Sequence, residues 1–239
     1  MKRIIKKILL IVLALTLVLS VVTFSYFGNY YHASTDAMTM IQETENVEQN
    51  EKYLAFVPKK YDTGIILYPG AKVESEAYAP LLKELANRGI FAAVVYMPLH
   101  FALLGSDIAL EVMEKHPEIS NWYIAGHSLG GVVAGMLVNK HPEKFKGIIL
   151  LASYVTFDLS QSGLKALSLI GSSDGVLNVE EYQKNRKNLP ADAIEITIEG
   201  GNHAQFASYG FQKNDNEADI TCEQQIQLTA DQIMKLIVE

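Results

Sequence analysis

Residues 126–130 have the sequence Gly-His-Ser-Leu-Gly and lie between two apolar segments. The first segment, 121–125, is typical of a buried strand, and the second, 132–138, is typical of a helix. A Gly-x-Ser-x-Gly pentapeptide between a strand and a helix forms a tight turn that exposes the serine hydroxyl at the tip of a sheet. Free N–H groups at the start of the helix favour developing negative charge there. The pattern therefore indicates that Ser128 is a nucleophile.

Two further polar side chains suited to acyl transfer follow predicted strands. Asp174 comes after a continuous apolar segment, and His203 comes after an alternating one. A serine hydroxyl needs a neighbouring imidazole to take its proton, and the imidazole needs a buried carboxylate to fix its tautomer. In open parallel sheets such groups meet beyond the carboxyl ends of the strands. We therefore expect Ser128, His203 and Asp174 to act together, with Asp158 as the rival acid.

Apolar and amphipathic segments alternate from residue 51 onward, which predicts a mostly parallel α/β sheet flanked by helices and joined by right-handed crossovers. Segment 51–58 ends in proline, and this favours an edge strand. Segment 153–163 is too short for a lid domain. The expected strands are 51–58, 63–68, 90–96, 121–125, 147–152, 164–170 and 193–198. The expected helices are 78–88, 102–116, 132–138, 179–188 and 221–238.

The N-terminal region differs from the rest of the chain. Four Lys and Arg residues precede the uncharged apolar run 8–27, and a helix of that length rises about 30 Å, enough to cross a bilayer core. Basic residues before the run match the positive-inside pattern. A retained transmembrane signal anchor is the favoured interpretation, a cleaved signal peptide is the second, and a buried core helix is the third. The first two predict an extracytoplasmic domain, either single-pass at the cell membrane or secreted.

These patterns divide the chain into an anchor (1–31), a polar linker (32–50) and an α/β domain (51–239). A short helix within residues 36–50 is the alternative interpretation of the linker. The net charge of the 239 residues is −7 although four positive charges lie in the first seven residues, so the remainder is more acidic still. An acidic domain argues against nucleic acid as a partner. The single cysteine, Cys222, excludes an intrachain disulfide and a pair of zinc-binding cysteines. No metal or cofactor is implied.

Three motifs together resemble the α/β-hydrolase superfamily, in the chain order serine, acid, histidine. They are Gly-His-Ser-Leu-Gly-Gly at 126–131, Gly-Ser-Ser-Asp at 171–174 and Gly-Gly-Asn-His at 200–203. Three others resemble its small, cap-less, dienelactone-hydrolase-like subgroup: Tyr-Pro-Gly at 68–70, Met-Pro-Leu at 97–99 and Asn-His-Ala-Gln-Phe at 202–206. The resemblance covers residues 53–239. It implies Ser128 as nucleophile, His203 as base and Asp174 as orienting acid.

The resemblance also implies an oxyanion hole built from two backbone N–H groups. One donor is the residue after the nucleophile, Leu129, and the other comes from the loop 69–72. Ala71 is the favoured second donor, with Gly70 and Lys72 as alternatives. Dienelactone hydrolases proper use a cysteine nucleophile, so the serine of this chain argues against dienelactone as the substrate.

Other side chains near these motifs have both a functional and a structural interpretation. We expect His127 to pack behind the turn and His100 to lie at the surface or in packing rather than in a substrate pocket. Six aromatic residues either line an acyl or alcohol pocket or belong to the core: Tyr78, Phe101, Tyr154, Phe157, Phe206 and Tyr209.

The expected function is that of a membrane-anchored serine carboxylesterase for small or medium acyl esters. A small-molecule acyl substrate and the lipid bilayer, through residues 8–27, are the expected partners. Thioesterase, amidase and peptidase activities use the same three residues and remain open. A non-catalytic binding protein on the same fold is the alternative from another functional class.

Overall fold

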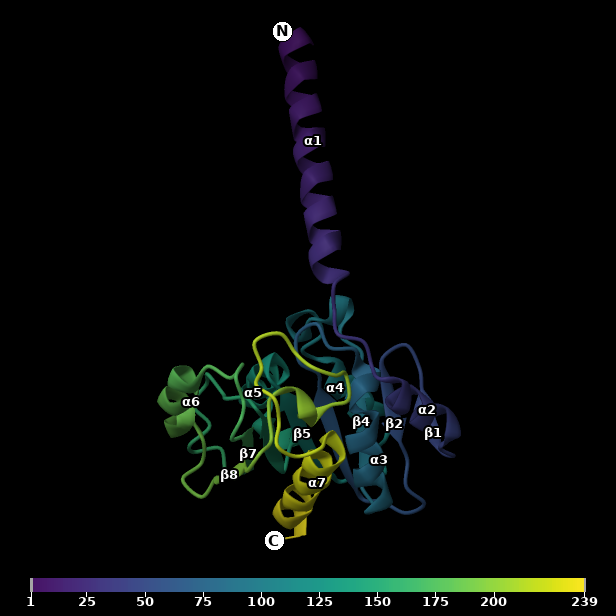
Figure 1. The fold of residues 1–239 in the computed structure, drawn as a ribbon, viewed down its shortest axis with the longest axis vertical. Helices are drawn as coiled ribbons and strands as arrows, with labels where there is room; N and C mark the ends of the chain where they lie inside the picture. The colour runs from purple at the N-terminus through teal and green to yellow at the C-terminus, as the bar shows by residue number, and fades with distance from the viewer. Residues whose placement is uncertain (1, 239) are drawn as a thin grey trace. The chain divides into compact units, whose positions relative to one another are not determined.

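The computed structural model describes residues 2–238 and separates the chain into two compact units, one ending at Tyr30 and one beginning at Tyr31. The first unit is helix α1, Lys2–Phe27, drawn in purple in Figure 1. Within it, Arg3–Val21 is apolar, exposed and long enough to cross a membrane, properties that a membrane anchor shares with a signal sequence. The side chains of residues 22–27 lie outside the described part.

The second unit is built on one eight-stranded sheet with the order β1-β2-β4-β3-β5-β6-β7-β8. Strand β2 pairs antiparallel with both of its neighbours, β1 and β4, whereas every pair from β4 through β3 and β5 to β8 is parallel. The prediction of a mostly parallel α/β sheet is confirmed. The strands are β1 (Val47–Gln49), β2 (Tyr53–Phe56), β3 (Thr63–Tyr68), β4 (Phe91–Val95), β5 (Asn121–His127), β6 (Gly147–Leu151), β7 (Lys165–Gly171) and β8 (Ile194–Ile198).

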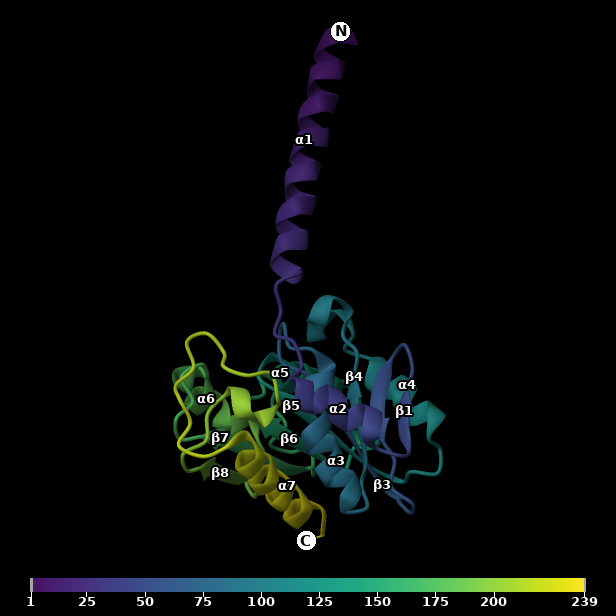
Figure 2. The same cartoon turned by 45° about the vertical axis from the view of Figure 1, so that its right-hand side comes forward.

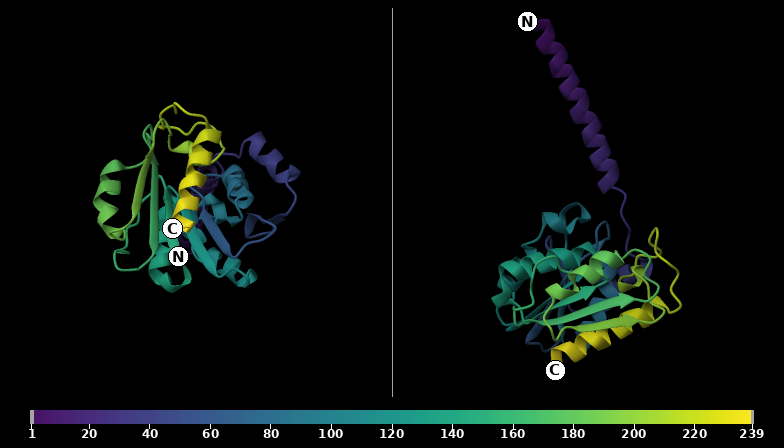
Figure 3. Two further views of the ribbon diagram at one scale, coloured as in Figure 1. Left: turned by 90° about the horizontal axis from the view of Figure 1, so that it is seen from below. Right: turned by 90° about the vertical axis from the view of Figure 1, so that its left-hand side faces the viewer.

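Helices cover both faces of this sheet (Figures 2 and 3). Neighbouring residues of β3 point to opposite faces, so that Ile65 belongs to one core and Ile66 to the other. The first core is closed by α2 (Thr35–Glu43), α3 (Ala79–Asn87) and α7 (Cys222–Val238), and the second by α4 (Ile108–Lys115) and α5 (Leu129–Lys140). Helix α6 (Val179–Asn185) lies beside β7 and β8 (Figure 1).

Two predictions about the start of this unit are wrong. The expected linker 32–50 instead contains α2 and β1, because the Ser34 hydroxyl caps α2 at the Ala37 N–H and the Ala37 side chain is fully buried. The expected edge strand is β2, but β1 pairs outside it, with Val47 opposite Phe56. Both elements are too short to produce a visible hydrophobic period. The folded unit therefore begins near Tyr31 rather than at residue 51.

The helix expected at 102–116 is also shorter than predicted. Ala102–Leu104 forms a 3₁₀ turn, Gly105 interrupts it, and α4 begins only at Ile108. Residues 153–163, between β6 and β7, contain neither helix nor strand, as expected for a fold without a lid domain.

Candidate active site

Strand β5 leads directly into the turn that carries Ser128. This residue has φ 51° and ψ −124°, a strained combination for an L-residue, and α5 begins at the next position. Such strain costs about 1–3 kcal/mol and persists only where the surroundings enforce it. A Cβ at Gly126 would lie 2.4 Å from the Gly131 backbone, and one at Gly130 would lie 2.1 Å from the Tyr68 carbonyl oxygen. The turn therefore has the geometry expected of a nucleophile elbow.

Asp174 and His203 meet at the carboxyl ends of β7 and β8. Nδ1 of His203 lies 2.9 Å from Oδ2 of Asp174, and both side chains are almost completely buried. The other oxygen of Asp174, Oδ1, accepts the backbone N–H groups of Val176 and Leu177, each at 2.8 Å. Because a carboxylate can only accept, Nδ1 of His203 carries the proton in this pair. Asp174 thus fixes the His203 tautomer in which Nε2 is a proton acceptor.

The backbone of His203 is held as well as its ring. Its N–H donates to Oδ1 of Asp215 at 3.3 Å, and its carbonyl oxygen accepts a hydrogen bond of 3.1 Å from Nε2 of His127. Nε2 of His203 is the one buried side-chain polar atom without a hydrogen-bond partner in the described part of the chain. A buried imidazole nitrogen that is held in place and unpaired is suited to accept a proton from a nucleophile.

His127, the residue before Ser128, lies in a chain of buried hydrogen bonds. Its Nε2 faces a carbonyl oxygen and must donate, so its Nδ1 accepts the Tyr78 hydroxyl proton at 2.7 Å. The Tyr78 oxygen in turn accepts the Gly70 N–H at 2.8 Å. Desolvation is the main cause that lowers the pKa of His127 well below its ordinary value, and the nearby His203 adds to this effect. His127 is therefore a neutral structural residue, as the sequence predicts.

These contacts connect the elbow with the acid–base pair. The His127 ring lies 4.8 Å from the His203 ring, centroid to centroid, and Ser128 is the next residue along the chain. Asp174 and His203 are hydrogen-bonded, whereas the Ser128 hydroxyl makes no hydrogen bond to Nε2 of His203 in the described structure. The carbonyl oxygen of Ser128 accepts the Ser153 hydroxyl at 2.6 Å, which fixes the elbow from the β6 side.

The two predicted oxyanion donors lie on adjoining segments. Leu129 is the first residue of α5, where backbone N–H groups have no partner within the helix. The close approach of Gly130 to the carbonyl oxygens of Tyr68 and Pro69 packs this helix end against the loop after β3. The loop after β3 and the start of α5 are thus in close contact next to Ser128.

Hydrogen bonds within that loop distinguish its three candidate donors. The Gly70 N–H is used by the Tyr78 hydroxyl, and the Lys72 N–H donates to the His100 carbonyl oxygen at 2.8 Å. Within the described residues, the Ala71 N–H has no hydrogen-bond acceptor. Ala71 is therefore the candidate whose donor is available, and its role as the second oxyanion donor stays a prediction.

The remaining candidates fall outside this arrangement. Asp158 is exposed and accepts the Ser160 N–H at 2.9 Å, a local turn contact, so the structure pairs His203 with Asp174 instead. Burial lowers the pKa of His100, whose carbonyl oxygen supports the loop at Lys72. The aromatic residues differ in burial: Tyr78, Phe206 and Tyr209 are buried, Phe101 and Tyr154 are partly buried, and Phe157 is exposed.

Two features of the site have no signal in the sequence. Asp215 lies in a polar loop with no strand before it, so its buried contact with the His203 backbone follows only from the fold. The Tyr78–His127 hydrogen bond joins positions separated by 49 residues.

In the described part of the chain no group of three or more His, Cys, Asp and Glu side chains is arranged to hold a metal ion.

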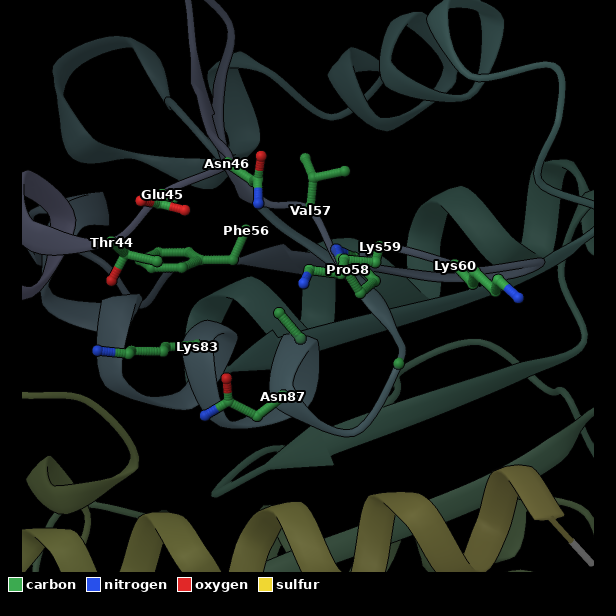
Figure 4. Close-up of a pocket in the computed structure, with 12 residues that line it drawn as sticks. Thr44, Glu45, Asn46, Phe56, Val57, Pro58, Lys59, Lys60, Lys83 and Asn87 are labelled. Atoms are coloured by element: carbon green, nitrogen blue, oxygen red, sulfur yellow. The ribbon is translucent and has the colours of Figure 1, made fainter.

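A separate hollow of about 620 Å³ lies at the opposite end of the strands from Ser128 (Figure 4). Lys59 and Lys60 precede β3 and Gly89 precedes β4, so the hollow opens at the amino ends of these strands. Ligands of open α/β sheets bind at the carboxyl ends. This hollow is therefore separate from the candidate active site.

The strand order, the strained serine and the Asp–His pair at one edge of the sheet together define an α/β-hydrolase fold. The model of the alpha/beta hydrolase family matches residues 64–227, and the chain belongs to this family. No match was found among curated protein sequences. The narrower, dienelactone-hydrolase-like subgroup stays a prediction.

Solved structures support the fold. A predicted CIB-like hydrolase from Thermoplasma acidophilum is similar, with 16% identity, TM-score 0.58, and 79% of this chain and 96% of that chain covered. Est1E from Butyrivibrio proteoclasticus has 14% identity and TM-score 0.58, with coverage of 81% and 98%. Esterase 2 of Thermogutta terrifontis, solved as phosphoramylated by tabun, has 14% identity and TM-score 0.58, with coverage of 82% and 96%. At these identities the similarity establishes the fold alone.

Proposed function

We propose that this protein is a serine hydrolase that cleaves esters of small or medium acyl groups. The observation that carries the proposal is the buried Asp174–His203 pair, whose unpaired Nε2 lies beside a strained serine turn. One solved protein of this fold, from Thermogutta terrifontis, is an esterase by name. The absence of a lid between β6 and β7 suits small soluble esters.

In the proposed mechanism, the Ser128 hydroxyl oxygen attacks the ester carbonyl carbon while Nε2 of His203 takes the hydroxyl proton. The negative charge on the former carbonyl oxygen is stabilised by the N–H groups of Leu129 and Ala71. Nε2 then returns the proton to the departing alkoxide, leaving an acyl-serine. Water attacks this ester with His203 again as base, and the acid is released. Asp174 stabilises the imidazolium in both steps.

The apolar helix α1 is the basis for a proposal about where the protein is located. We propose that it anchors the protein in the cell membrane as a single-pass helix, with the catalytic unit on the extracytoplasmic side; secretion after signal cleavage is the alternative. Mass measurement of the mature protein decides between them. A product that lacks α1 would exclude the anchor.

Hydrolysis of a matched substrate panel tests the proposed reaction. The full-length protein in detergent is assayed with acetyl, butyryl, octanoyl and lauroyl groups, each as nitrophenyl ester, thioester and anilide. The proposal predicts the highest kcat/KM for a short or medium ester. A preference for thioesters or anilides would indicate a thioesterase or an amidase. No turnover of any member by folded protein would indicate a binding protein. A soluble fragment must keep residues from Tyr31 onward, because a start at Glu51 would remove α2 and β1.

A further inference from the structure

We propose that Asp215 is a positioning residue that holds the acid and the base of the active site in one geometry; this inference rests on the proposed function. Asp215 is 7% exposed and accepts four backbone N–H groups. Its Oδ1 accepts from Gly175, His203 and Asn216 at 3.0, 3.3 and 3.0 Å. Its Oδ2 accepts from Ala204 at 2.8 Å.

The origin of these donors gives the carboxylate its role. Gly175 follows Asp174 in the loop after β7, and His203 and Ala204 belong to the loop after β8. One carboxylate therefore binds the backbones of the two loops whose side chains meet at the 2.9 Å bond between Nδ1 of His203 and Oδ2 of Asp174. A shift of either loop would change that bond and the direction of Nε2.

The chemistry of the position requires a carboxylate. Only an ionised Asp or Glu accepts on both oxygens while offering no donor, and here both oxygens face N–H groups. Asn would place an NH₂ group against one of these donors. No ion pair in the described part of the chain includes Asp215, and every hydrogen bond to its side chain there comes from a backbone N–H group.

The loop after β8, which carries His203, is also held by a residue other than Asp215. Oε1 of Gln225, on α7, accepts the Asn202 N–H at 3.0 Å, and Nε2 of Gln225 donates to the Asn202 carbonyl oxygen at 2.8 Å. The loop thus remains attached to α7 when Asp215 is changed. The effect expected from Asp215 is therefore on the placement of His203 relative to Asp174 rather than on the presence of the loop.

The test compares Asp215→Asn and Asp215→Ala with Asp219→Asn in the full-length protein. Asp219 is an exposed residue of the same polar loop, and its side chain makes no hydrogen bond within the described structure, so Asp219→Asn provides the same change of charge. Four quantities are measured: kcat and KM for nitrophenyl butyrate, the thermal midpoint, and the downfield proton resonance of the Nδ1–H of His203, assigned with His203→Gln.

Asp215→Asn is expected to lower kcat about 10- to 100-fold with little change in KM, because misplacement of a catalytic group by about 1 Å can cost about 100-fold. It should also shift or broaden the Nδ1–H resonance, whereas Asp219→Asn should change neither. Wild-type kcat and an unchanged resonance in Asp215→Asn would overturn the inference. Unfolding of both Asp215 variants would also overturn the inference, because Asp215 would then be required for the stability of the fold. If the wild type has no activity, the proposed function fails, and the resonance alone still decides the role of Asp215.

Discussion

The carboxyl ends of the parallel strands form one edge of the sheet, the carboxyl edge, and their amino ends form the other, the amino edge. These two edges differ in where the backbone is strained. At the carboxyl edge, the left-handed residues are Lys72 after β3, Leu99 and His100 after β4, Ser128 after β5 and Ala152 after β6. At the amino edge, positive φ falls on residues that tolerate it, such as Gly89 before β4 and Asn46 before β1. Strain in ordinary residues persists where packing enforces it and gathers at functional sites.

The two edges also differ in the side chains that they carry. The hollow of about 620 Å³ in Figure 4 lies at the amino edge, and the long side chains of Lys59, Lys60 and Lys83 are among those that line it. The carboxyl edge has instead two buried carboxylates, Asp174 and Asp215, bonded to backbone N–H groups. Buried, fixed polar groups locate the chemistry better than the size of an open hollow does.

Exchange of the acid should produce the largest loss of activity. Asp174→Asn keeps the shape of the side chain but removes the acceptor that fixes the His203 tautomer, so kcat should fall about 10⁴-fold. Asp158→Asn, in the loop after β6, is the matched control and should keep wild-type kcat. Steady-state kinetics on both variants checks this. Equal losses in the two variants would remove the distinction between the acid of the site and a turn residue.

Removal of one oxyanion donor should have a smaller effect. Gly70 accepts from the Val73 N–H at 3.2 Å, and Lys72 has φ 60°, which makes Ala71 the second residue of a type II-like turn. Proline is favoured at that position, so Ala71→Pro removes the N–H without opposing the turn. We expect kcat to fall about 10²- to 10³-fold.

Ala71→Gly is the control for the oxyanion donor, because it keeps the N–H and should retain most activity. Full activity in a folded Ala71→Pro variant would show that the second donor lies elsewhere in the loop.

The buried His127 should make stability depend on pH. Its folded pKa is lowered, so the neutral form is the one that folds, and its contribution is complete above the unfolded pKa of about 6.5. As the pH falls below that value, the unfolded chain binds a proton that the folded chain does not. The free energy of unfolding should then fall by up to about 1.4 kcal/mol per pH unit.

Urea unfolding at several pH values, with His127→Gln as reference, measures this contribution. The slope between about pH 7 and pH 5 should be shallower in the variant. Parallel slopes would mean that His127 titrates alike in the folded and unfolded chains.

Changes at the amino edge should have the smallest effect. Lys59→Ala combined with Lys60→Ala alters the lining of the large hollow, and kcat and KM should stay at their wild-type values. A loss of kcat comparable to that of Ala71→Pro would contradict the assignment of chemistry to the carboxyl edge.

The sequence was informative where a pattern is local or repeated. The buried strands around Ser128 are continuous apolar segments, and the glycines of the elbow are required by contacts that the turn itself creates. The β1 strand has three residues and α2 has nine, so neither shows a period against the polar segment 32–50. Asp215 and Tyr78 act through backbone groups or residues distant in the chain. Such contacts depend on tertiary packing and have no local sequence signal.

The central claim is that Ser128 is the nucleophile and that His203 activates it. Mass-spectrometric mapping of a fluorophosphonate adduct on the full-length protein, beside Ser128→Ala and His203→Gln, tests it most directly. We expect the adduct on the peptide that contains Ser128, no adduct in Ser128→Ala, and strongly slowed labelling in His203→Gln. An adduct on another residue, or equal labelling of wild type and His203→Gln, would contradict the account.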